Sequence, residues 1–96
     1  MKKTINGKRF DTSNSIIIWA WSPILDAKSP TWFSETLYRR PRGDWFLVGQ
    51  GKRLSPYGAH GARGRISGEK IVPLSHKEAL TWLKAHDKHG IAALHQ

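Results

Sequence analysis

The sequence contains no cysteine, few acidic residues and no long hydrophobic run. Without cysteine the chain can form neither a disulfide nor a zinc–thiolate site, and it offers no thiolate nucleophile. The longest apolar run, Ile16 to Trp21, is strand-sized and far shorter than the roughly 20 residues of a membrane-spanning helix. The opening Met1-Lys2-Lys3 is not followed by the apolar stretch of a signal peptide. We therefore expect a cytoplasmic protein with no membrane partner.

The chain length of 96 residues is that of one small domain, so we assign residues 1–96 to a single domain. Hydrophobic residues make up 39% of the chain and include five tryptophans, which is enough to build one core. We expect Trp19, Trp32 and Trp82 to lie in that core.

Positive charge is concentrated in the middle of the chain. Residues 39 to 65 contain seven basic residues and one acidic residue, Asp44, so this segment supplies +6 of the net charge of +9. Such a segment attracts nucleic acid or an acidic protein face, and the alternative is a solvated surface with no charged partner. The candidate binding residues are the seven basic residues and one aromatic that could stack on bases: Arg39, Arg40, Arg42, Lys52, Arg53, Tyr57, Arg63 and Arg65. We predict that these side chains converge on one surface.

The stretch from Trp32 to Gly51 predicts a β-hairpin at the centre of a sheet. Its two arms, residues 32–39 and 45–48, are rich in aromatic and β-branched residues, which favour strands. Between them, Pro41, Gly43 and Asp44 are typical turn residues. The neighbouring aromatics Tyr38 and Trp45 are expected to belong to the sheet rather than to a binding site.

Three other segments have strand or turn signals. Asn6-Gly7 is a strong type I′ turn signal and predicts a short N-terminal hairpin. Residues 16–21 are continuous and mostly β-branched or aromatic, which favours a strand buried on both faces, although a helix over 14–21 is the alternative. Residues 68–74 return to strand character, and Pro73 is expected to end the ladder.

A capping box predicts the C-terminal helix, which we place at Ser75–Asp87. Ser75 and Glu78 have the spacing at which each side chain bonds the other residue's backbone amide. Apolar residues then recur at helical spacing, and we expect Gly90 to cap the end, with residues 91–94 adding a last apolar turn. The predicted fold is α+β: a small twisted antiparallel sheet of about four strands with one C-terminal helix packed on one face.

No motif for catalysis or metal binding is complete. Gly49-Gln50-Gly51-Lys52 has glycines like those of phosphate-binding loops but lacks the rest of the fingerprint, so a tight turn is the better interpretation. Residues 49–68, with six glycines, predict a long mobile loop. His86, Asp87 and His89 are explained by a helix end, and His60 and His76 lack a nucleophile at recognisable spacing. We expect no enzymatic activity, no metal and no cofactor.

Several short motifs occur in an order that resembles a family of small proteins carried by phages, plasmids and integrative elements. They are ETLYR at 35–39, RGxWFLxGxG at 42–51, GEKIxPLS at 68–75, EALxW at 78–82 and INGKRFDT at 5–12. The resemblance implies an accessory or counter-defence protein similar to anti-CRISPR proteins. At Gln50 and Lys52 the sequence departs from the acidic residue and the glycine of that pattern, so no partner carries over.

Two functions of different classes follow from charge and resemblance. The first is a non-enzymatic anti-CRISPR-type inhibitor, whose basic face binds an acidic site of a host CRISPR-Cas effector protein or its guide RNA in the host cytoplasm. The second is a nucleic-acid-binding accessory or regulatory protein, with DNA as a further possible ligand. A third, an enzyme acting on a phosphorylated ligand, needs a concave site that joins Gly49–Gly51 to His60.

Overall fold

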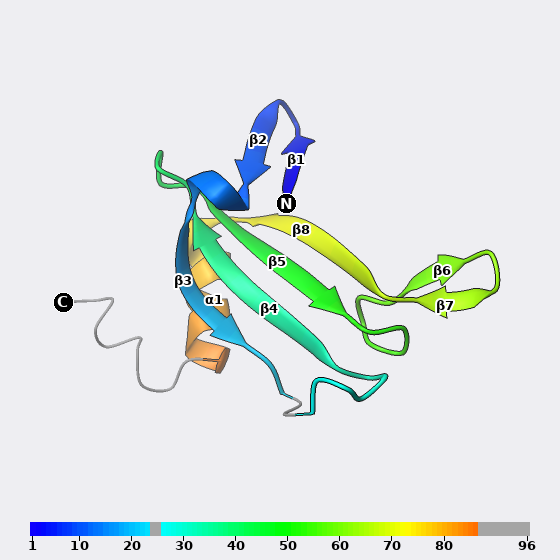
Figure 1. The fold of residues 1–96 in the computed structure, drawn as a ribbon. Coiled ribbons are helices and arrows are strands. Elements are labelled where there is room, and N and C mark those ends of the chain that lie inside the picture. Colours follow the sequence, from blue (N-terminus) through cyan, green and yellow to red (C-terminus); the bar gives the residue numbers. More distant parts are fainter. Residues whose placement is uncertain (24–25, 87–96) are drawn as a thin grey trace.

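The computed structural model describes residues 1–23 and 26–86 and contains the antiparallel sheet that the sequence predicts (Figure 1). The four strands lie in the order β3–β4–β5–β8. Their bounds are Ile16–Trp21 for β3, Phe33–Arg39 for β4, Trp45–Gly51 for β5 and Gly68–Leu74 for β8. One helix, α1 (His76–His86), follows β8. The predicted α+β fold is confirmed.

The hairpin at the centre of the sheet is formed by β4 and β5. Its register runs from Phe33 opposite Gly51 to Arg39 opposite Trp45. At the turn, the amide of Arg40 donates to the carbonyl oxygen of Asp44 at 2.7 Å. Gly43 has a φ of 95°, a conformation in which a side chain would be strained. The predicted hairpin and its turn residues are therefore confirmed.

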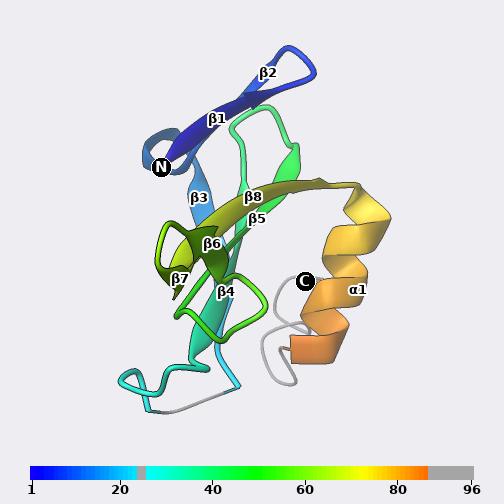
Figure 2. The same cartoon turned by 90° about the vertical axis from the view of Figure 1, so that its right-hand side faces the viewer.

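Successive apolar side chains of β5 point to opposite faces of the sheet and belong to two separate cores, one on each face. One core lies under α1, which lies along one side of the sheet in Figure 2. Its buried members are Leu37, Trp45, Leu47, Ala79 and Leu83. The other core lies under a two-stranded ribbon formed by β1 (Lys2–Ile5) and β2 (Lys8–Asp11). Its buried members are Phe10, Phe46, Val48 and Ile71.

The N-terminal ribbon has the turn that Asn6-Gly7 predicts. Asn6 and Gly7 have φ values of 51° and 79°, the positive pair that a type I′ turn requires. Phe10 on β2 anchors the ribbon, since its ring meets the Phe46 ring edge-on at a centroid distance of 5.4 Å. A 3-10 turn, η1 (Thr12–Asn14), then leads the chain into β3.

The segment of residues 16–21 is a strand, but the expectation that both its faces are buried is wrong. β3 is an edge strand, and Ile16 and Ile17 are 65% and 59% exposed. The helix α1 packs mainly against β5 and β8 and reaches β3 at its end, where His86 meets Trp21. Trp19 is 37% exposed, so it is not a core residue either. On the opposite edge of the sheet, Pro73 pairs with Phe46 one residue before β8 ends. Because no strand lies beyond β8, the sheet needs no backbone N–H that points outward at this position.

Residues 49–68 do not form a structureless loop. β5 continues to Gly51, and the chain then makes a compact turn before β6 (Ala59–Gly61) and β7 (Gly64–Ile66). These two short strands form a hairpin, here called the arm, which projects beyond the end of the sheet (Figure 1). The predicted tight turn at Gly49-Gln50-Gly51 is also wrong, because all three residues belong to β5.

Close packing explains the glycine at position 49. A Cβ there would overlap the ring of Tyr57, which folds back over the strand. At Gly51, a Cβ would overlap the side chain of Ser55 in the same returning segment. These glycines therefore let the chain return across its own sheet, which is a packing requirement rather than a phosphate-binding one.

The helix begins as the capping box predicts. The amide of Glu78 donates to Ser75 Oγ at 3.1 Å, and the amide of Ser75 donates to Glu78 Oε1 at 2.9 Å. Ala79 and Leu83 are buried against the sheet, and Trp82 packs at the border of that core. The predicted end at Asp87, the cap at Gly90 and the turn at 91–94 lie outside the described residues.

Candidate polyanion interface

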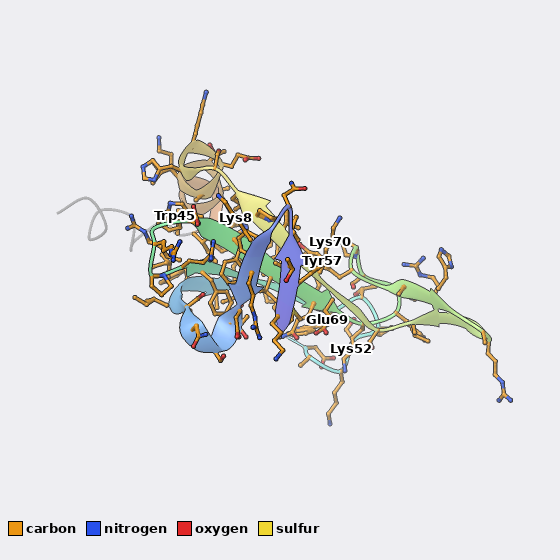
Figure 3. All side chains as sticks on the ribbon, turned by 90° about the horizontal axis from the view of Figure 1, so that it is seen from above. Lys8, Trp45, Lys52, Tyr57, Glu69 and Lys70 are labelled. Carbon is orange, nitrogen blue, oxygen red and sulfur yellow. The ribbon has the colours of Figure 1, made fainter. Side chains whose placement is uncertain are left out.

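The basic residues do not converge on one surface. In the β4–β5 register, Arg39 lies at the end opposite to Phe33 and Gly51. Arg40 and Arg42 follow Arg39 into the turn, whereas Lys52 and Arg53 follow Gly51 at the other end of the sheet. Figure 3 shows the same separation, with Lys8 and Trp45 at one end and Lys52 and Glu69 toward the arm. The predicted single surface is therefore wrong, and the candidate residues form two groups.

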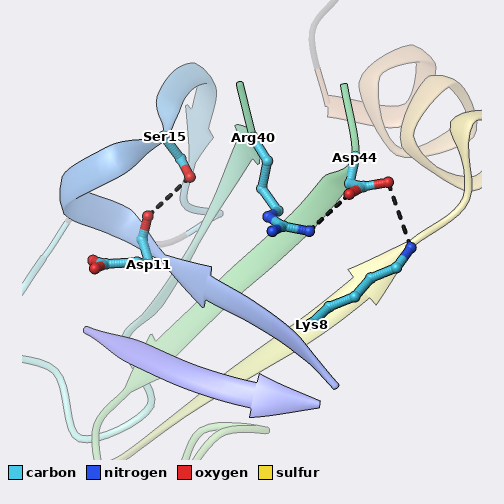
Figure 4. A network of polar contacts seen from close by, with 5 residues as sticks. All are labelled: Lys8, Asp11, Ser15, Arg40 and Asp44. Carbon is cyan, nitrogen blue, oxygen red and sulfur yellow. Dashed lines mark hydrogen bonds and ion pairs between the residues drawn. The ribbon is translucent and has the colours of Figure 1, made fainter. Parts of the chain in front are cut away.

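Much of the charge at the turn end is neutralised within the protein. Arg40 donates to Asp44 Oδ2 at 2.7 Å, and Lys8 Nζ lies 3.6 Å from Asp44 Oδ1 (Figure 4). The Arg40 guanidinium also stacks over the Phe10 ring at 5.2 Å, and its side chain is only 18% exposed. Arg40 therefore holds the N-terminal ribbon to the turn, which is a structural role.

The other arginines of the turn end are more open. Arg39 lies over the Trp45 ring at 4.8 Å, a cation–π contact on the α1 side. Arg42 is exposed and, with Arg9 and Arg40, lines a cavity of about 260 Å³. Asp11 also lines this cavity, and its pKa is lowered mainly by hydrogen bonds from Ser13. That carboxylate remains charged near neutral pH and opposes the binding of a second anion.

At the opposite end of the sheet, the positive charges are not paired with described carboxylates. We call it the arm end and define it by five exposed basic residues: Lys28, Lys52, Arg53, Arg63 and Arg65. The sequence has no acidic residue between Asp44 and Glu69. Within residues 1–23 and 26–86, no carboxylate lies within ion-pair distance of any of the five. Their charges are therefore available to a partner.

Hydrogen bonds to backbone carbonyl oxygens hold the arm end in a fixed shape. The Arg65 side chain donates from Nε to the carbonyl oxygen of Arg53 at 2.7 Å, which ties the arm to the loop before it. The amides of Lys52 and Leu54 donate to the carbonyl oxygens of Trp32 and Pro30 at 2.8 and 2.9 Å. Arg63 lies in the two-residue turn between β6 and β7, at the tip of the arm.

Tyr57, a predicted binding residue, is half-buried and makes its contacts within the fold. Its hydroxyl donates to Glu35 Oε2, and its ring packs against Gly49 and Phe33. Burial, followed by the hydrogen bond to Glu35, raises the pKa of Tyr57 well above its ordinary value. The hydroxyl thus remains protonated and bound within the fold. A contact between residues 22 positions apart leaves no signal in the sequence.

Two adjoining cavities lie beside these cations at the arm end. One has a volume of about 420 Å³ and is lined by Trp32, Gln50, Gly51, Lys52, Ser67, Gly68 and Glu69. The other has a volume of about 560 Å³ and is lined by Lys28, Pro30, Lys52, Arg53, Ile66 and Ser67. Because both contain Lys52 and Ser67, we treat them as one open groove, the Trp32 groove.

Trp32 and Lys28 are the members of this site that the sequence reasoning missed. Trp32 was assigned to the core, although it directly follows a break at Pro30 and Thr31. It is half-buried and lines the groove instead. Lys28 lies in a loop far from the basic segment in sequence, and only the fold brings it to Lys52 and Arg53.

His60 and the glycines of β5 do not share a described cavity. His60 is exposed on the arm and is not among the residues that line the cavity at Gln50 and Gly51. The described part of the chain has no group of three His, Cys, Asp or Glu residues placed to hold a metal ion. Of His86, Asp87 and His89, only His86 is described, and the centroid of its ring lies 3.8 Å from that of the Trp21 ring.

Comparisons with known proteins found no family model, no curated protein and no solved structure that matches this chain. The described residues also contain no helix with the length and hydrophobicity to cross a membrane.

Proposed function

We propose that this chain is a non-enzymatic protein that binds a polyanion through its arm end. The observation that carries the proposal is the group of five exposed cations at the arm end, of which Lys28, Lys52 and Arg53 line the Trp32 groove. None of the five lies within ion-pair distance of a described carboxylate. Unpaired charges along a concave surface raise the local concentration of an oppositely charged partner and speed its association. At the turn end, by contrast, Asp44 forms ion pairs with Lys8 and Arg40 and so neutralises part of the charge.

The biological setting we propose is counter-defence in the cytoplasm of a host cell. The resemblance to small mobile-element proteins supports this setting, and an anti-CRISPR-type inhibitor needs only a binding surface. The target would be an acidic site of a CRISPR-Cas effector protein or the guide RNA that the effector carries. Inhibition would then follow from occupying that site, without any chemical step by this protein.

The test compares two charge reversals of equal size. Lys52→Glu combined with Arg53→Glu changes the arm end, and Lys2→Glu combined with Lys3→Glu changes the exposed N-terminal ribbon. Affinity capture from a host lysate, with and without ribonuclease, would identify the partner by mass spectrometry. Cleavage assays with the captured effector would then measure inhibition by each protein.

We expect the arm-end variant to lose capture and inhibition while the ribbon variant keeps both. Ribonuclease removes the partner if the ligand is guide RNA and leaves it if the ligand is protein. Equal loss in both variants would mean that net charge alone drives the binding, and the arm-end proposal would be abandoned.

The second candidate function is a nucleic-acid-binding accessory or regulatory protein. The arm favours it, because a two-stranded ribbon has the width to enter a groove of a nucleic acid duplex. His60 and Arg65 are opposite each other on this ribbon, with Arg63 at its tip. This function predicts tight binding of DNA or RNA by the purified protein and no effect on CRISPR–Cas cleavage, which the assays above distinguish.

A further inference from the structure

Trp32 has an indole ring without an aromatic partner among the described residues. Trp21, Trp45 and Trp82 each contact another ring, and Trp82 Nε1 also donates to Glu35. Trp32 has no such ring contact, and its indole N–H donates to no atom of the described chain. It lies instead along the cavity that also contains Lys52. A large amphipathic ring therefore lies at the wall of a basic groove.

The backbone holds Trp32 firmly in this position. Its amide donates to the carbonyl oxygen of Ser29 at 3.0 Å, and its own carbonyl oxygen accepts from the amide of Lys52 at 2.8 Å. The next residue, Phe33, directs its ring to Trp21 and Tyr57, at centroid distances of 5.9 and 6.0 Å. Successive side chains of an extended chain alternate between faces, so the two rings serve different purposes. Phe33 packs inside the fold, and Trp32 lines the groove.

We propose that the Trp32 groove binds single-stranded nucleic acid, with a base stacked on Trp32 and the flanking phosphates held by Lys28, Lys52 and Arg53. This inference rests on the proposed function and names the chemical class of its ligand. Aromatic side chains beside a basic groove are the usual arrangement for unpaired strands, because any base can stack on a ring while cations follow the backbone. In a duplex, the base faces are already stacked and the ring has no access.

Glu69 distinguishes this ligand from an acidic protein segment. Its carboxylate lines the same cavity as Trp32, and Glu69 pairs with Gln50 across β5 and β8. A carboxylate repels the acidic side chains of a protein but accepts hydrogen bonds from the exocyclic amino group of cytosine or adenine. Phosphate contacts position a strand and base-edge contacts give preference. The cations and Glu69 therefore have separate roles in one site.

The placement of Glu69 gives the site a base preference. Uracil has no exocyclic amino group, and its one ring donor, N3–H, lies between two carbonyl oxygens that repel the Glu69 carboxylate, so the contact is less favourable than with an amino group. The groove therefore binds oligo(C) and oligo(A) more tightly than oligo(U). Glu69→Gln keeps the shape of the side chain and supplies both a donor and an acceptor, so this variant binds oligo(U) and oligo(C) with more similar affinities.

The experiment measures the fluorescence anisotropy of labelled oligonucleotides of about 8 residues at low salt, a length within the range that one small domain covers. The probes are oligo(C), oligo(A), oligo(U) and a blunt duplex of the same length. We expect Trp32→Ala to weaken oligo(C) binding by at least about 5-fold, the lower limit for loss of one base–aromatic stack. Trp32→Phe should retain most of the affinity, and Trp19→Ala, which removes an exposed tryptophan on β3, should bind like the parent protein.

The outcomes distinguish the stacking site on Trp32 from the broader polyanion-binding function. If Trp32→Ala binds like the parent, or if the duplex binds as tightly as oligo(C), the stacking site is wrong. If the Lys52→Glu, Arg53→Glu variant loses binding and Trp32→Ala does not, the polyanion function stands and the stacking site on Trp32 does not. If Trp32→Ala does not fold, Glu69→Gln still tests the site, since an unchanged preference for oligo(C) over oligo(U) would contradict it.

Discussion

Glu35 on β4 links three parts of the molecule through one carboxylate. Trp82 of α1 donates to its Oε1 at 3.0 Å, and Tyr57 from the segment before the arm donates to its Oε2. His86 Nε2 lies 4.0 Å from Oε1. The side chain is only 16% exposed, and a carboxylate so far removed from water needs these donors. Helix, sheet and returning loop therefore depend on the same residue.

Removing the Tyr57 hydroxyl should destabilise the protein measurably. Tyr57→Phe deletes one donor to Glu35 and keeps the ring that packs on Gly49. We expect the free energy of unfolding to fall by about 2 kcal/mol, a typical value for a hydrogen bond to a charged group. Urea unfolding measures this change. Tyr38→Phe is the matched control, because Tyr38 stacks on Phe46 at 5.1 Å and its hydroxyl bonds no described residue.

The control should stay within about 0.5 kcal/mol of the parent protein. Equal stability of Tyr57→Phe and the parent would mean that the Glu35 contact adds nothing to the fold. The same residue shows a limit of sequence reasoning. Tyr57 was predicted to bind a ligand because it lies among arginines, but its environment is set by Glu35 and Gly49, which only the folded chain brings to it.

The capping box makes a prediction for the helix as an element. Ser75→Ala removes the side-chain acceptor for the Glu78 amide, which is one of the four unpaired donors at the start of α1. We expect a loss of about 1 kcal/mol in the free energy of unfolding. Ser67→Ala is the control, because Ser67 is exposed and makes no hydrogen bond with the described residues. A Ser75→Ala variant as stable as the Ser67→Ala variant would show that the cap is not needed.

The same box predicts a dependence on pH. Hydrogen bonds from Ser75 lower the pKa of Glu78 below its ordinary value of 4.5. A lowered folded-state pKa means that the contribution is complete above the unfolded-state value and is lost as pH falls through the folded-state value. Thermal unfolding should therefore show a loss of stability below about pH 4.5 that is smaller in Glu78→Gln. An identical acid profile in both proteins would contradict this role.

Elements with local signals were predictable, and their surroundings were not. The hairpin at Asn6-Gly7, the turn at residues 40–44 and the capped helix each depend on residues a few positions apart. The edge position of β3 depends on which strand pairs with which, so its exposed Ile16 and Ile17 could not be foreseen. The arm was missed because its strands have only three residues each and are rich in glycine.

At the scale of the whole molecule, the sequence correctly indicated a basic segment, but it did not indicate that the fold divides this segment into two groups. Residues 39–42 and 52–65 are close in sequence, and β5 lies between them. A strand of seven residues spans about 20 Å, so the two groups must lie at opposite ends of it. Their separation follows from the extended strand, and the local neutralisation by Asp44 follows from the turn.

The salt dependence of binding distinguishes a local site from attraction by the whole surface. For a single strand, the slope of log K against log salt is about −0.7 for each phosphate contact. Five cations at the arm end limit the slope to about −3.5, whereas contacts equal to the full net charge of +9 would give about −6. We expect oligo(C) of about 16 residues, a length with enough phosphates for nine contacts, to show the shallower slope. Anisotropy titrations over a range of salt concentrations measure it.

Single substitutions show which cations contribute to that slope. Lys52→Ala should make it less steep by about 0.7, because one phosphate contact and its counterion release are lost. Arg42→Ala removes an exposed charge at the turn end and should leave the slope unchanged. Equal flattening by both substitutions, or a slope near that of the full net charge, would mean that the ligand moves over the whole basic surface. In that case the division of charge along β5 would have no functional consequence, since the ligand would not distinguish the two ends.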